Sequence, residues 1–380
     1  MFFLFLRRVL ICAGMELKEL HIVNFKNIGE ASLDFSPGVN CFVGRNGAGK
    51  TNVLDAVYHL SMCKSFFGLP DGQHIRHGEA FFVVQGSYDR EGEAVEVYCG
   101  VKRGGKKVFK KNQKVYGRLS EHIGLLPLVM VSPEDGVLIE GGSEERRRLV
   151  DGIICQCDRD YLHRLIRYNK VLMQRNSLLK SAGGRGLEGE ALEVWDEQLA
   201  DNGEVIMRRR REFLEEFRGV FQFYYEELSS GREAVELVYK PSAEEGGLLE
   251  GLRRTAARDR MLTYTSVGVH RDDLGLHIGG YPVRKIGSQG QKKTFLLALK
   301  LAQYAWILRT GGVKPLLLLD DVFDKLDAER VRQIVRIVGG ELFGQVFMTD
   351  TNREHLDEIL RGQAVDYRLF QVEGGEVVKV

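Results

Sequence analysis

The sequence is poor in proline and tryptophan, which account for 7 and 2 of its 380 residues, whereas it contains 44 glycines. Many of its turns must therefore depend on glycine. No apolar run reaches the roughly 18 residues that a membrane-spanning helix needs. Lys and Arg total 54 and Asp and Glu total 53. This balance excludes a uniformly basic nucleic-acid coat, but it leaves room for a local basic patch.

Cysteine is also scarce, and the spacing of the cysteines does not indicate a metal site. Of the six cysteines, only Cys155 and Cys157 are close together, and no second pair follows at the spacing of a zinc site. This usage is typical of reduced thiols in a cytosolic protein, so we expect a cytoplasmic location.

The first 14 residues differ in character from the rest. Their apolar run precedes Arg7 and Arg8, whereas a signal peptide carries its positive charges first. We interpret residues 1–14 as an N-terminal extension or the product of an upstream start, with a weak signal peptide as the alternative.

The length suggests two domains, at about 100–200 residues each. Residues 15–135 and 263–380 have the apolar patterns of strands and helices of an α/β lobe. Residues 136–262 are charged and helix-periodic, with two helices joined by a glycine-rich turn. We expect an inserted, mainly helical lobe there. Because it lacks a long heptad array, it is not an extended coiled-coil arm.

The segment GRNGAGKT matches the phosphate-loop pattern G-x-x-x-x-G-K-[ST] in full, and it lies between an apolar strand and an amphipathic helix. Glycines let backbone N–H groups curl around an anion, and the helix N-terminus adds partial positive charge. We expect Lys50 to reach the β- and γ-phosphates of a nucleotide and Thr51 to ligate Mg²⁺. A chance glycine-rich turn is the alternative. The predicted nucleotide-binding residues of the loop are Gly44, Arg45, Asn46, Gly47, Ala48, Gly49, Lys50 and Thr51.

A second half of the site is predicted where the apolar run LLLL ends in two acids. Ligands bind at the carboxyl ends of strands in α/β sheets. Asp320 is placed to hold Mg²⁺, and Asp321 could polarise the attacking water as a general base. Lys50, Asp320 and Asp321 are therefore the predicted catalytic residues. Two carboxylates that cap a turn are the alternative.

A third element is the segment SQGQ, which we call the signature loop and which comprises Ser288, Gln289, Gly290 and Gln291. It precedes a long amphipathic helix, and a Ser-Gly turn at a helix N-terminus is a second anion site. Many helices begin this way. The signature loop is therefore a candidate anion site only because it follows the phosphate loop and precedes the paired acids in the sequence.

This order resembles the ABC-type ATPase heads of the SMC class, and the finer matches resemble the bacterial RecF family. They cover nearly the whole chain from Met15. The matching segments are LHIVNFKNI, GRNGAGKTNVLDAVYHLS, VSPEDGVLIEGGSEERRRLVD, GVHRDDL, GSQGQKKTFLLALKLA and DDVFDKLD. The resemblance implies an α/β, ABC-type P-loop ATPase head with an inserted, mainly helical lobe.

It also implies a mechanism that spacing alone does not show. Such heads dimerise around ATP, and Ser288 and Gly290 of one subunit would contact the γ-phosphate held by Lys50 of the other. Gln289, Gln291 and Asp327 would complete that seam. Slow, DNA-stimulated hydrolysis of ATP to ADP and phosphate, with Mg²⁺, would then release the dimer and its DNA.

The partners that the resemblance implies are DNA gaps or single-/double-strand junctions, with RecO and RecR helping to load RecA in recombinational repair. The alternatives are an ATPase subunit of a transporter and a non-hydrolysing, ATP-dependent scaffold. Two departures stand out. Transporter heads have Glu where this chain has Asp321, and no His follows the strand QVFM, so Thr349 or Thr351 would sense the γ-phosphate. Glu134 is the candidate for the glutamine-loop position.

A basic hairpin at residues 106–114 is the strongest local charge cluster. Its lysines can neutralise DNA phosphates, and a solvated edge strand that resists aggregation is the alternative. The resemblance favours DNA contact by Lys106, Lys107, Lys110, Lys111 and Lys114. The arginine runs 146–148 and 208–211 are flanked by Glu, so helix-surface ion pairs are as plausible there. The segment HRDD at residues 270–273 could form a metal or catalytic cluster, but we favour a structural salt bridge between Arg271 and the two acids beside it.

Overall fold

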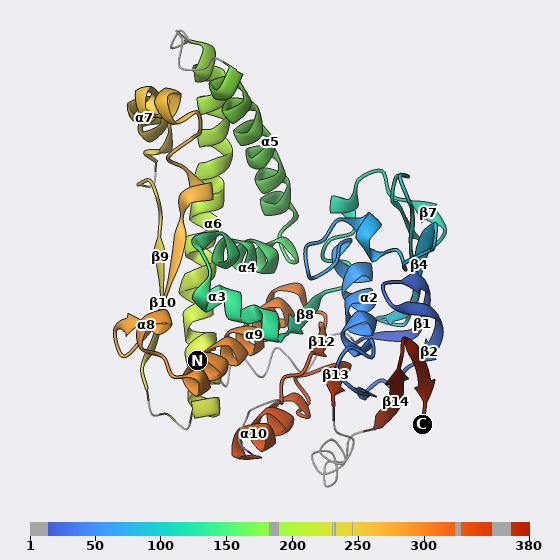
Figure 1. Cartoon of the computed structure of the whole chain (residues 1–380). Helices are drawn as coiled ribbons and strands as arrows, with labels where there is room; N and C mark the ends of the chain where they lie inside the picture. Colours follow the sequence, from blue (N-terminus) through green and yellow to red (C-terminus); the bar gives the residue numbers. More distant parts are fainter. Residues whose placement is uncertain are drawn as a thin grey trace. The chain divides into compact units, whose positions relative to one another are not determined.

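The computed structural model describes residues 14–181, 190–229, 231, 233–244, 246–323, 328–351 and 366–380 (Figure 1). The chain divides into two compact units. Unit 1 comprises the residues up to 135 and residues 299–380, and unit 2 comprises residues 136–298. Of the expected extension at residues 1–14, only Gly14 belongs to the described part.

Unit 1 contains a six-stranded antiparallel sheet in the order β2-β1-β4-β5-β6-β7. Its long strands alternate buried and exposed residues, as expected of a sheet with one face on the core. The strands are β1 Met15–Phe25, β2 Ile28–Asp34, β4 Phe81–Arg90, β5 Glu93–Lys102, β6 Val108–Lys111 and β7 Lys114–Val115.

A second six-stranded sheet of unit 1 has the order β15-β14-β3-β13-β12-β8. Its neighbouring strands run parallel, except that β15 is antiparallel to β14. Strands β3, β8, β12 and β13 are buried along their whole length, as expected of parallel strands covered on both faces. The strands are β3 Val39–Val43, β8 Leu128–Val131, β12 Leu316–Leu319, β13 Val346–Asp350, β14 Tyr367–Glu373 and β15 Glu376–Lys379.

The core of unit 1 lies where helix α2 packs against both sheets. Val53, Leu54, Val57 and Leu60 of this helix belong to one hydrophobic cluster with residues of β1, β4 and β12. The helices of the unit are α2 Lys50–Met62, η1 Asp71–His74, η2 Leu119–Glu121, η3 Pro133–Gly136, α10 Ala328–Val338 and the second half of α9 Gln289–Gly311.

Unit 2 is mainly helical. Helices α5 and α6 run side by side, which confirms the predicted helical hairpin (Figure 1). A small sheet in the order β11-β10-β9 completes the unit. Its elements are α3 Val137–Glu140, α4 Ser143–Cys155, α5 Arg159–Ser181, α6 Glu190–Ser229, β9 Val235–Lys240, α7 Leu248–Leu262, η4 Val269–Arg271, β10 Asp273–Ile278, β11 Tyr281–Pro282, α8 Val283–Ile286 and the first half of α9.

The second boundary between the units differs from the expected return to the α/β lobe at residue 263. Strand β10 pairs antiparallel with β9 over the full length of both strands, from Asp273–Lys240 to Ile278–Val235. This pairing keeps residues 263–298, and with them the signature loop, in unit 2. The boundary therefore lies inside α9.

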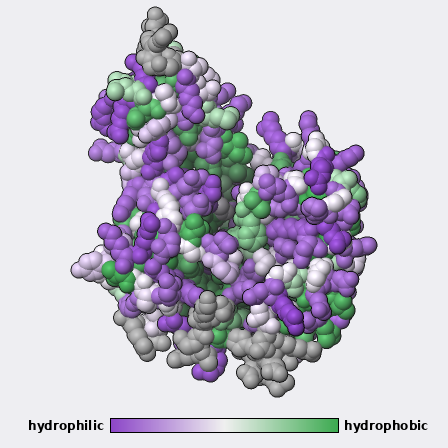
Figure 2. Space-filling model, in the orientation of Figure 1, coloured by the Kyte–Doolittle hydropathy of each residue, from purple (hydrophilic) through white to green (hydrophobic). Residues whose placement is uncertain are grey.

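Hydrophilic residues cover much of the visible surface (Figure 2). Within the described part of the chain, no helix is long and apolar enough to cross a membrane. Cys41, Cys63, Cys99, Cys155 and Cys157 are reduced and are not joined to one another by disulfides.

Candidate functional site

The phosphate loop connects β3 to α2 in unit 1. Lys50 is 4% exposed, and its Nζ donates hydrogen bonds to the carbonyl oxygens of Gly44 at 2.8 Å and Arg45 at 3.2 Å. The ammonium group therefore lies folded over the loop. Gly47 and Gly49 have φ angles of 78° and 121°, a region that strains any residue with a Cβ. The glycines of the motif are thus required by the backbone.

Two turns that are distant in sequence brace the loop from outside. The carbonyl oxygen of Ala48 accepts hydrogen bonds from Asn27 Nδ2 at 3.0 Å and from the Gly375 N–H at 2.9 Å. Asn52 Nδ2 donates to Asn27 Oδ1 at 2.7 Å. A Cβ on Gly375 would lie 2.2 Å from the carbonyl oxygen of Asn27, so only glycine fits. Sequence reasoning missed both residues, because neither belongs to a charged or nucleotide-binding pattern.

Thr51 and Asp320, the two residues predicted to ligate Mg²⁺, lie in contact although they are far apart in sequence. Thr51 Oγ1 lies 2.9 Å and 3.0 Å from the two carboxylate oxygens of Asp320. Asp320 follows β12 and Thr51 lies in the first turn of α2, so the two elements place a hydroxyl and a carboxylate side by side. Hydroxyl and carboxylate oxygens are suitable ligands for Mg²⁺. Burial raises the pKa of Asp320, and the hydrogen bonds from Thr51 and Thr349 act in the opposite direction.

Thr349 has its hydroxyl engaged with the acidic pair. It is 1% exposed, donates to Asp320 Oδ1 at 2.9 Å, and accepts from the backbone N–H of Asp321 at 2.9 Å. Asp321 has a φ of 46°, a conformation that this contact helps to hold. Thr349 thus orients both acids. Thr351, the other candidate sensor, is exposed after β13.

Two other predicted positions add little. Glu134 is exposed in η3, whereas its neighbour Asp135 is buried and binds Lys300 Nζ at 2.6 Å. Asp327 lies outside the described residues.

The signature loop forms a reciprocal capping box at the start of α9. The Ser288 N–H donates to Gln291 Oε1 at 2.7 Å, and the Gln291 N–H donates to Ser288 Oγ at 3.2 Å. Gln291 Nε2 also donates to Glu233 Oε1, and the other oxygen of Glu233 accepts from Tyr225 OH at 2.6 Å. Glu233 therefore ties the signature loop to α6. It lies just before β9, and no sequence pattern pointed to it.

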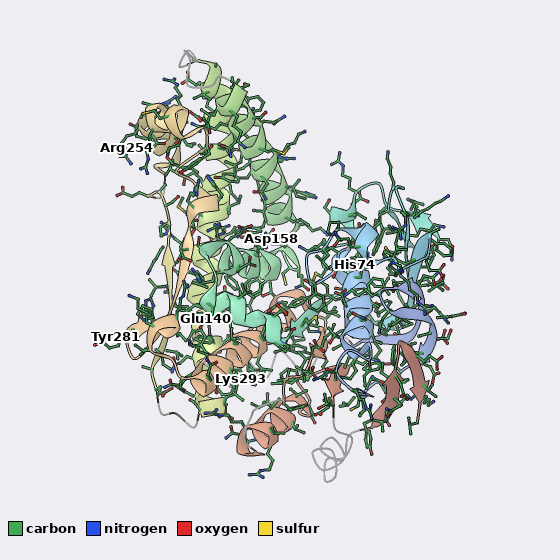
Figure 3. All side chains as sticks on the ribbon, in the orientation of Figure 1. His74, Glu140, Asp158, Arg254, Tyr281 and Lys293 are labelled. Atoms are coloured by element: carbon green, nitrogen blue, oxygen red, sulfur yellow. The ribbon has the colours of Figure 1, made fainter. Side chains whose placement is uncertain are left out.

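Two lysines follow the signature loop on α9. Lys292 Nζ binds Glu140 of α3 at 2.7 Å, and Glu140 and Lys293 are labelled in Figure 3. The ion pair joins the start of α9 to α3 within unit 2.

The basic hairpin presents four of its five lysines at the surface. Lys106 and Lys114 are exposed, Lys111 is partly exposed, and Lys110 Nζ lies 5.1 Å from the centre of the Tyr98 ring. Lys107 is different. Its Nζ binds Asp71 at 2.7 Å and donates to the carbonyl oxygen of Cys63 at 2.7 Å, with the side chain 14% exposed. The assignment of Lys107 to DNA is wrong, because its ammonium group holds the hairpin to the α2–η1 connection.

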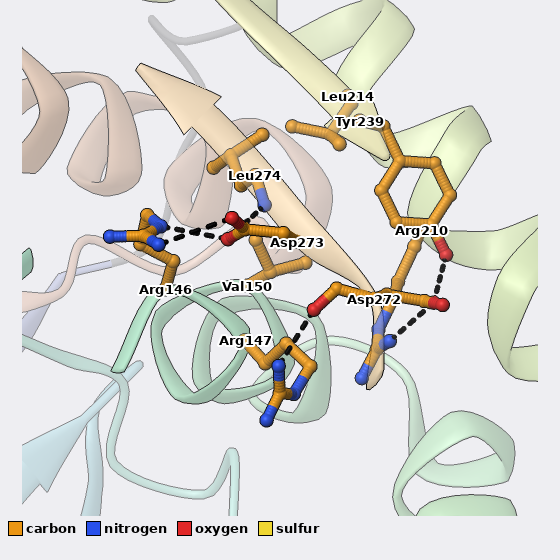
Figure 4. A pocket seen from close by; sticks show the side chains of 9 residues that line it. All are labelled: Arg146, Arg147, Val150, Arg210, Leu214, Tyr239, Asp272, Asp273 and Leu274. Carbon is orange, nitrogen blue, oxygen red and sulfur yellow. Dashed lines mark hydrogen bonds and ion pairs between the residues drawn. The ribbon is translucent and has the colours of Figure 1, made fainter. Parts of the chain in front are cut away.

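Several arginines of the two runs form ion pairs with acidic residues. Arg148 binds Glu144 and Glu145, and Arg208 lies near Glu212. Figure 4 shows a denser cluster, in which Arg146 and Arg210 reach the acids of residues 270–273.

In this cluster Arg146 binds Asp273 at 2.8 Å, and the buried Arg210 binds Asp272 at 2.9 Å. Both acids therefore form structural salt bridges, but the predicted partner, Arg271, is wrong. Arg271 instead donates to the carbonyl oxygen of Thr265 and lies over the Tyr264 ring.

The fold and the phosphate site define an SMC-type ATPase head. The family model described as RecF/RecN/SMC N terminal domain matches residues 16–376. A solved SMC head bound to the C-winged helix domain of ScpA has a TM-score of 0.57 at 17% identity, over 96% of this chain and 97% of that chain, which supports the fold alone.

Relatives of higher sequence identity show to which family of this ATPase class the chain belongs. The DNA replication and repair protein RecF of Phocaeicola vulgatus is 54% identical over 367 residues, covering 96% of this chain and 98% of the relative. RecF of Bacteroides fragilis is 53% identical over 364 residues, with 96% and 98% covered. A solved structure of the recombination mediator protein RecF-ATPrS in the RecFOR pathway has a TM-score of 0.87 at 34% identity, over 97% of this chain and 100% of that chain. The chain belongs to the RecF family, as the motif order predicted.

Proposed function

We propose that this protein is an ATP-dependent DNA-binding protein of bacterial recombinational repair, acting in the cytoplasm as a slow ATPase. The contact between Thr51 and Asp320 carries the ATPase part of the proposal. A phosphate loop alone indicates nucleotide binding, whereas a hydroxyl and a carboxylate side by side next to that loop provide ligands for Mg²⁺. Relatives support ATP as the nucleotide, because solved RecF structures carry ATP or ATPrS in their descriptions.

Each residue of the phosphate site has a distinct task in this proposal. Lys50 moves from the carbonyl oxygens that it now contacts to the β- and γ-phosphates, whose negative charge stabilises its ammonium group more strongly. Thr51 and Asp320 would hold Mg²⁺, which would neutralise charge on the phosphate oxygens. Asp321, held in place by the Thr349 hydroxyl, orients and polarises the attacking water.

The signature loop completes the site in a homodimer. Ser288 and Gly290 of one subunit contact the γ-phosphate held by Lys50 of the other, with Gln289, Gln291 and Asp327 at the same seam. The capping box supports this arrangement, because it fixes the polar groups of Ser288 at the N-terminus of a long helix, where an anion is stabilised. ATP then stabilises the dimer by binding across it, and hydrolysis releases the subunits.

DNA is the proposed macromolecular partner. Lys106, Lys110, Lys111 and Lys114 of the basic hairpin contact backbone phosphates independently of sequence. We propose gaps and single-/double-strand junctions as the DNA structures, and RecO and RecR as the partners in loading RecA. The support is the family and the RecFOR pathway named for the solved relatives.

The first test is ATP hydrolysis with and without gapped duplex DNA. We expect slow turnover that gapped DNA accelerates. Hydrolysis that DNA leaves unchanged would contradict the DNA-stimulated role and favour a head that drives another partner, such as a transporter. ATP-dependent DNA binding without turnover would instead support a scaffold.

The dimer has a separate test. The variant Ser288→Arg places a bulky cation in the seam, so we expect it to lose ATP-dependent dimerisation in light scattering. Gln73→Arg is the matched control, because Gln73 is exposed in η1 and gains the same charge away from both nucleotide motifs. An unchanged dimer fraction for Ser288→Arg would contradict the cross-subunit site.

A further inference from the structure

The cations of unit 2 fall into two groups, those with an acidic partner and those without one. Membership of a run of consecutive arginines does not show to which group a cation belongs. Those in the conspicuous runs have acidic partners, such as Arg148 with Glu144 at 2.5 Å. Arg253 of α7 likewise binds Glu193 at 2.7 Å. Several exposed cations without a partner in the described part of the chain lie on α5, where they are scattered along the sequence.

One face of α5 is basic throughout. From His163 to Ser181 the chain contains no Asp or Glu. Arg167, Lys170 and Lys180 are exposed in this segment, and the described residues give them no ion pair or hydrogen-bond partner. Spacings of three, four and seven residues bring side chains to one face of a helix. Arg159, His163, Arg167 and Lys170 therefore form a continuous stripe. Lys180 adds a cation near the end of the helix, ten residues beyond Lys170 and about 80° around the axis from it.

The opposite face of α5 holds the helix rigidly. Arg175 is fully buried and binds Asp196 of α6 at 2.6 Å and Asp259 of α7 at 2.8 Å. Tyr168 is also buried, and its OH lies 2.8 Å from His270 Nδ1. The basic stripe is thus presented by a fixed backbone, so a partner would need to order only the side chains of the stripe.

We propose that this exposed face of α5, which we call the α5 stripe, is a second contact surface for the phosphates of duplex DNA. The inference rests on the proposed DNA-binding function and adds a site to the basic hairpin. Arg159 and Lys180 are 21 residues apart. At about 1.5 Å per residue the stripe is about 31 Å long, and duplex DNA offers one phosphate charge per about 1.7 Å of its axis.

The residues of the stripe suit DNA better than an acidic protein. Asn169 and Ser177 add exposed side chains that can donate hydrogen bonds to phosphate oxygens. The exposed apolar residues are Ile166 and Met173, two turns apart and without an aromatic neighbour on this face. Protein interfaces concentrate aromatic anchors in a buried centre, which a single convex helix of this composition does not provide.

The test compares two triple variants that lose the same charge. Arg167→Gln, Lys170→Gln and Lys180→Gln remove unpaired cations of the α5 stripe, and glutamine preserves helix propensity. The control replaces Arg148, Arg208 and Arg253 with Gln. These arginines are 65%, 54% and 49% exposed on helices of the same unit, but each has an acidic partner. Binding of full-length protein to gapped duplex DNA is measured by fluorescence anisotropy, with ATP, over a salt series.

For the α5 variant we expect the slope of log affinity against log salt to lose about 2–3 in magnitude, because each lost phosphate contact removes about 0.9. The control should keep the wild-type slope. Equal losses in both variants would overturn the proposal, because net charge alone would then explain the binding. An unchanged slope in the α5 variant would also overturn it, and if that variant had lost binding to polyglutamate, the face would belong to an acidic protein.

The wild-type slope and one single variant keep the outcomes separate. If the wild type shows no salt-dependent DNA binding, the proposed function fails and the α5 stripe fails with it. Wild-type binding with an unchanged α5 slope overturns the α5 stripe alone. If the triple variant does not fold, Lys170→Gln alone is measured, with an expected slope loss of about 0.9, and no loss would overturn the proposal.

Discussion

Glu233 offers a sharp test of how the signature loop is held, through the variant Glu233→Ala. Its carboxylate accepts hydrogen bonds from Gln291 Nε2 and Tyr225 OH, and Gln291 in turn caps Ser288. Removing the carboxylate frees the Gln291 side chain to adopt other rotamers. We expect the signature loop to lose its fixed geometry while the phosphate loop, in the other unit, keeps its own.

The size of the effect follows from the contacts. A hydrogen bond to a charged group contributes about 1.5–3 kcal/mol, and because Glu233 is partly exposed we take about 1 kcal/mol for each loop. A two-fold symmetric dimer contains two such loops, so dimerisation weakens by about 2 kcal/mol. This corresponds to an association constant about 30-fold lower.

Analytical ultracentrifugation with a non-hydrolysable ATP analogue measures this constant, and a fluorescent nucleotide reports binding to the monomer. Glu233→Gln should restore most of the dimer, because its amide oxygen can still accept from Gln291. Glu236→Ala is the control, since Glu236 is an exposed carboxylate on β9 with no partner in the described part of the chain. A dimer constant within twofold of wild type for Glu233→Ala would refute the reasoning, as would an equal loss in Glu236→Ala.

Three other predictions concern the phosphate loop, helix α2 and buried histidines. Lys50→Arg should abolish phosphate release yet keep some nucleotide binding, because the charge stays but its geometry changes; wild-type turnover would contradict the assignment. Asp55→Ala should lower the free energy of unfolding in urea by about 3–5 kcal/mol, since it leaves Lys26, now 2.7 Å from that fully buried carboxylate, without its partner. Burial lowers the pKa of His122 and of His270 to about 4, against about 6.5 unfolded. The unfolded state therefore binds more protons in that window, so stability should fall as pH drops from about 6.5 to 4, by up to about 3 kcal/mol for each histidine, and a flat urea profile would contradict this.

The parts of the site that the sequence predicted are formed by residues that are contiguous in the chain. Eight consecutive residues form the phosphate loop, and Asp320 directly follows a run of four leucines, so strand ends alone place them at one sheet edge. Apolar periodicity likewise predicted the α5–α6 hairpin.

The missed parts depend on contacts between distant segments. Nothing in the local pattern distinguishes Lys107, which binds Asp71, from the exposed Lys106 beside it. Glu233 is one acid among many until the fold brings it to Gln291. The later boundary of unit 2 follows from the pairing of β9 with β10 across an intervening helix, a register that periodicity cannot specify.

The two hydrogen bonds to Ala48 have a consequence for the order of events during synthesis. The phosphate loop leaves the ribosome early, but Gly375, which braces it, is translated 327 residues after Ala48. Strand β14, which lies beside β3 just before the loop, is also made late. A nascent or prematurely terminated chain therefore carries the whole nucleotide motif without its supports. We therefore expect nucleotide binding to require the late C-terminal strands, so that a partial chain would occupy neither ATP nor DNA.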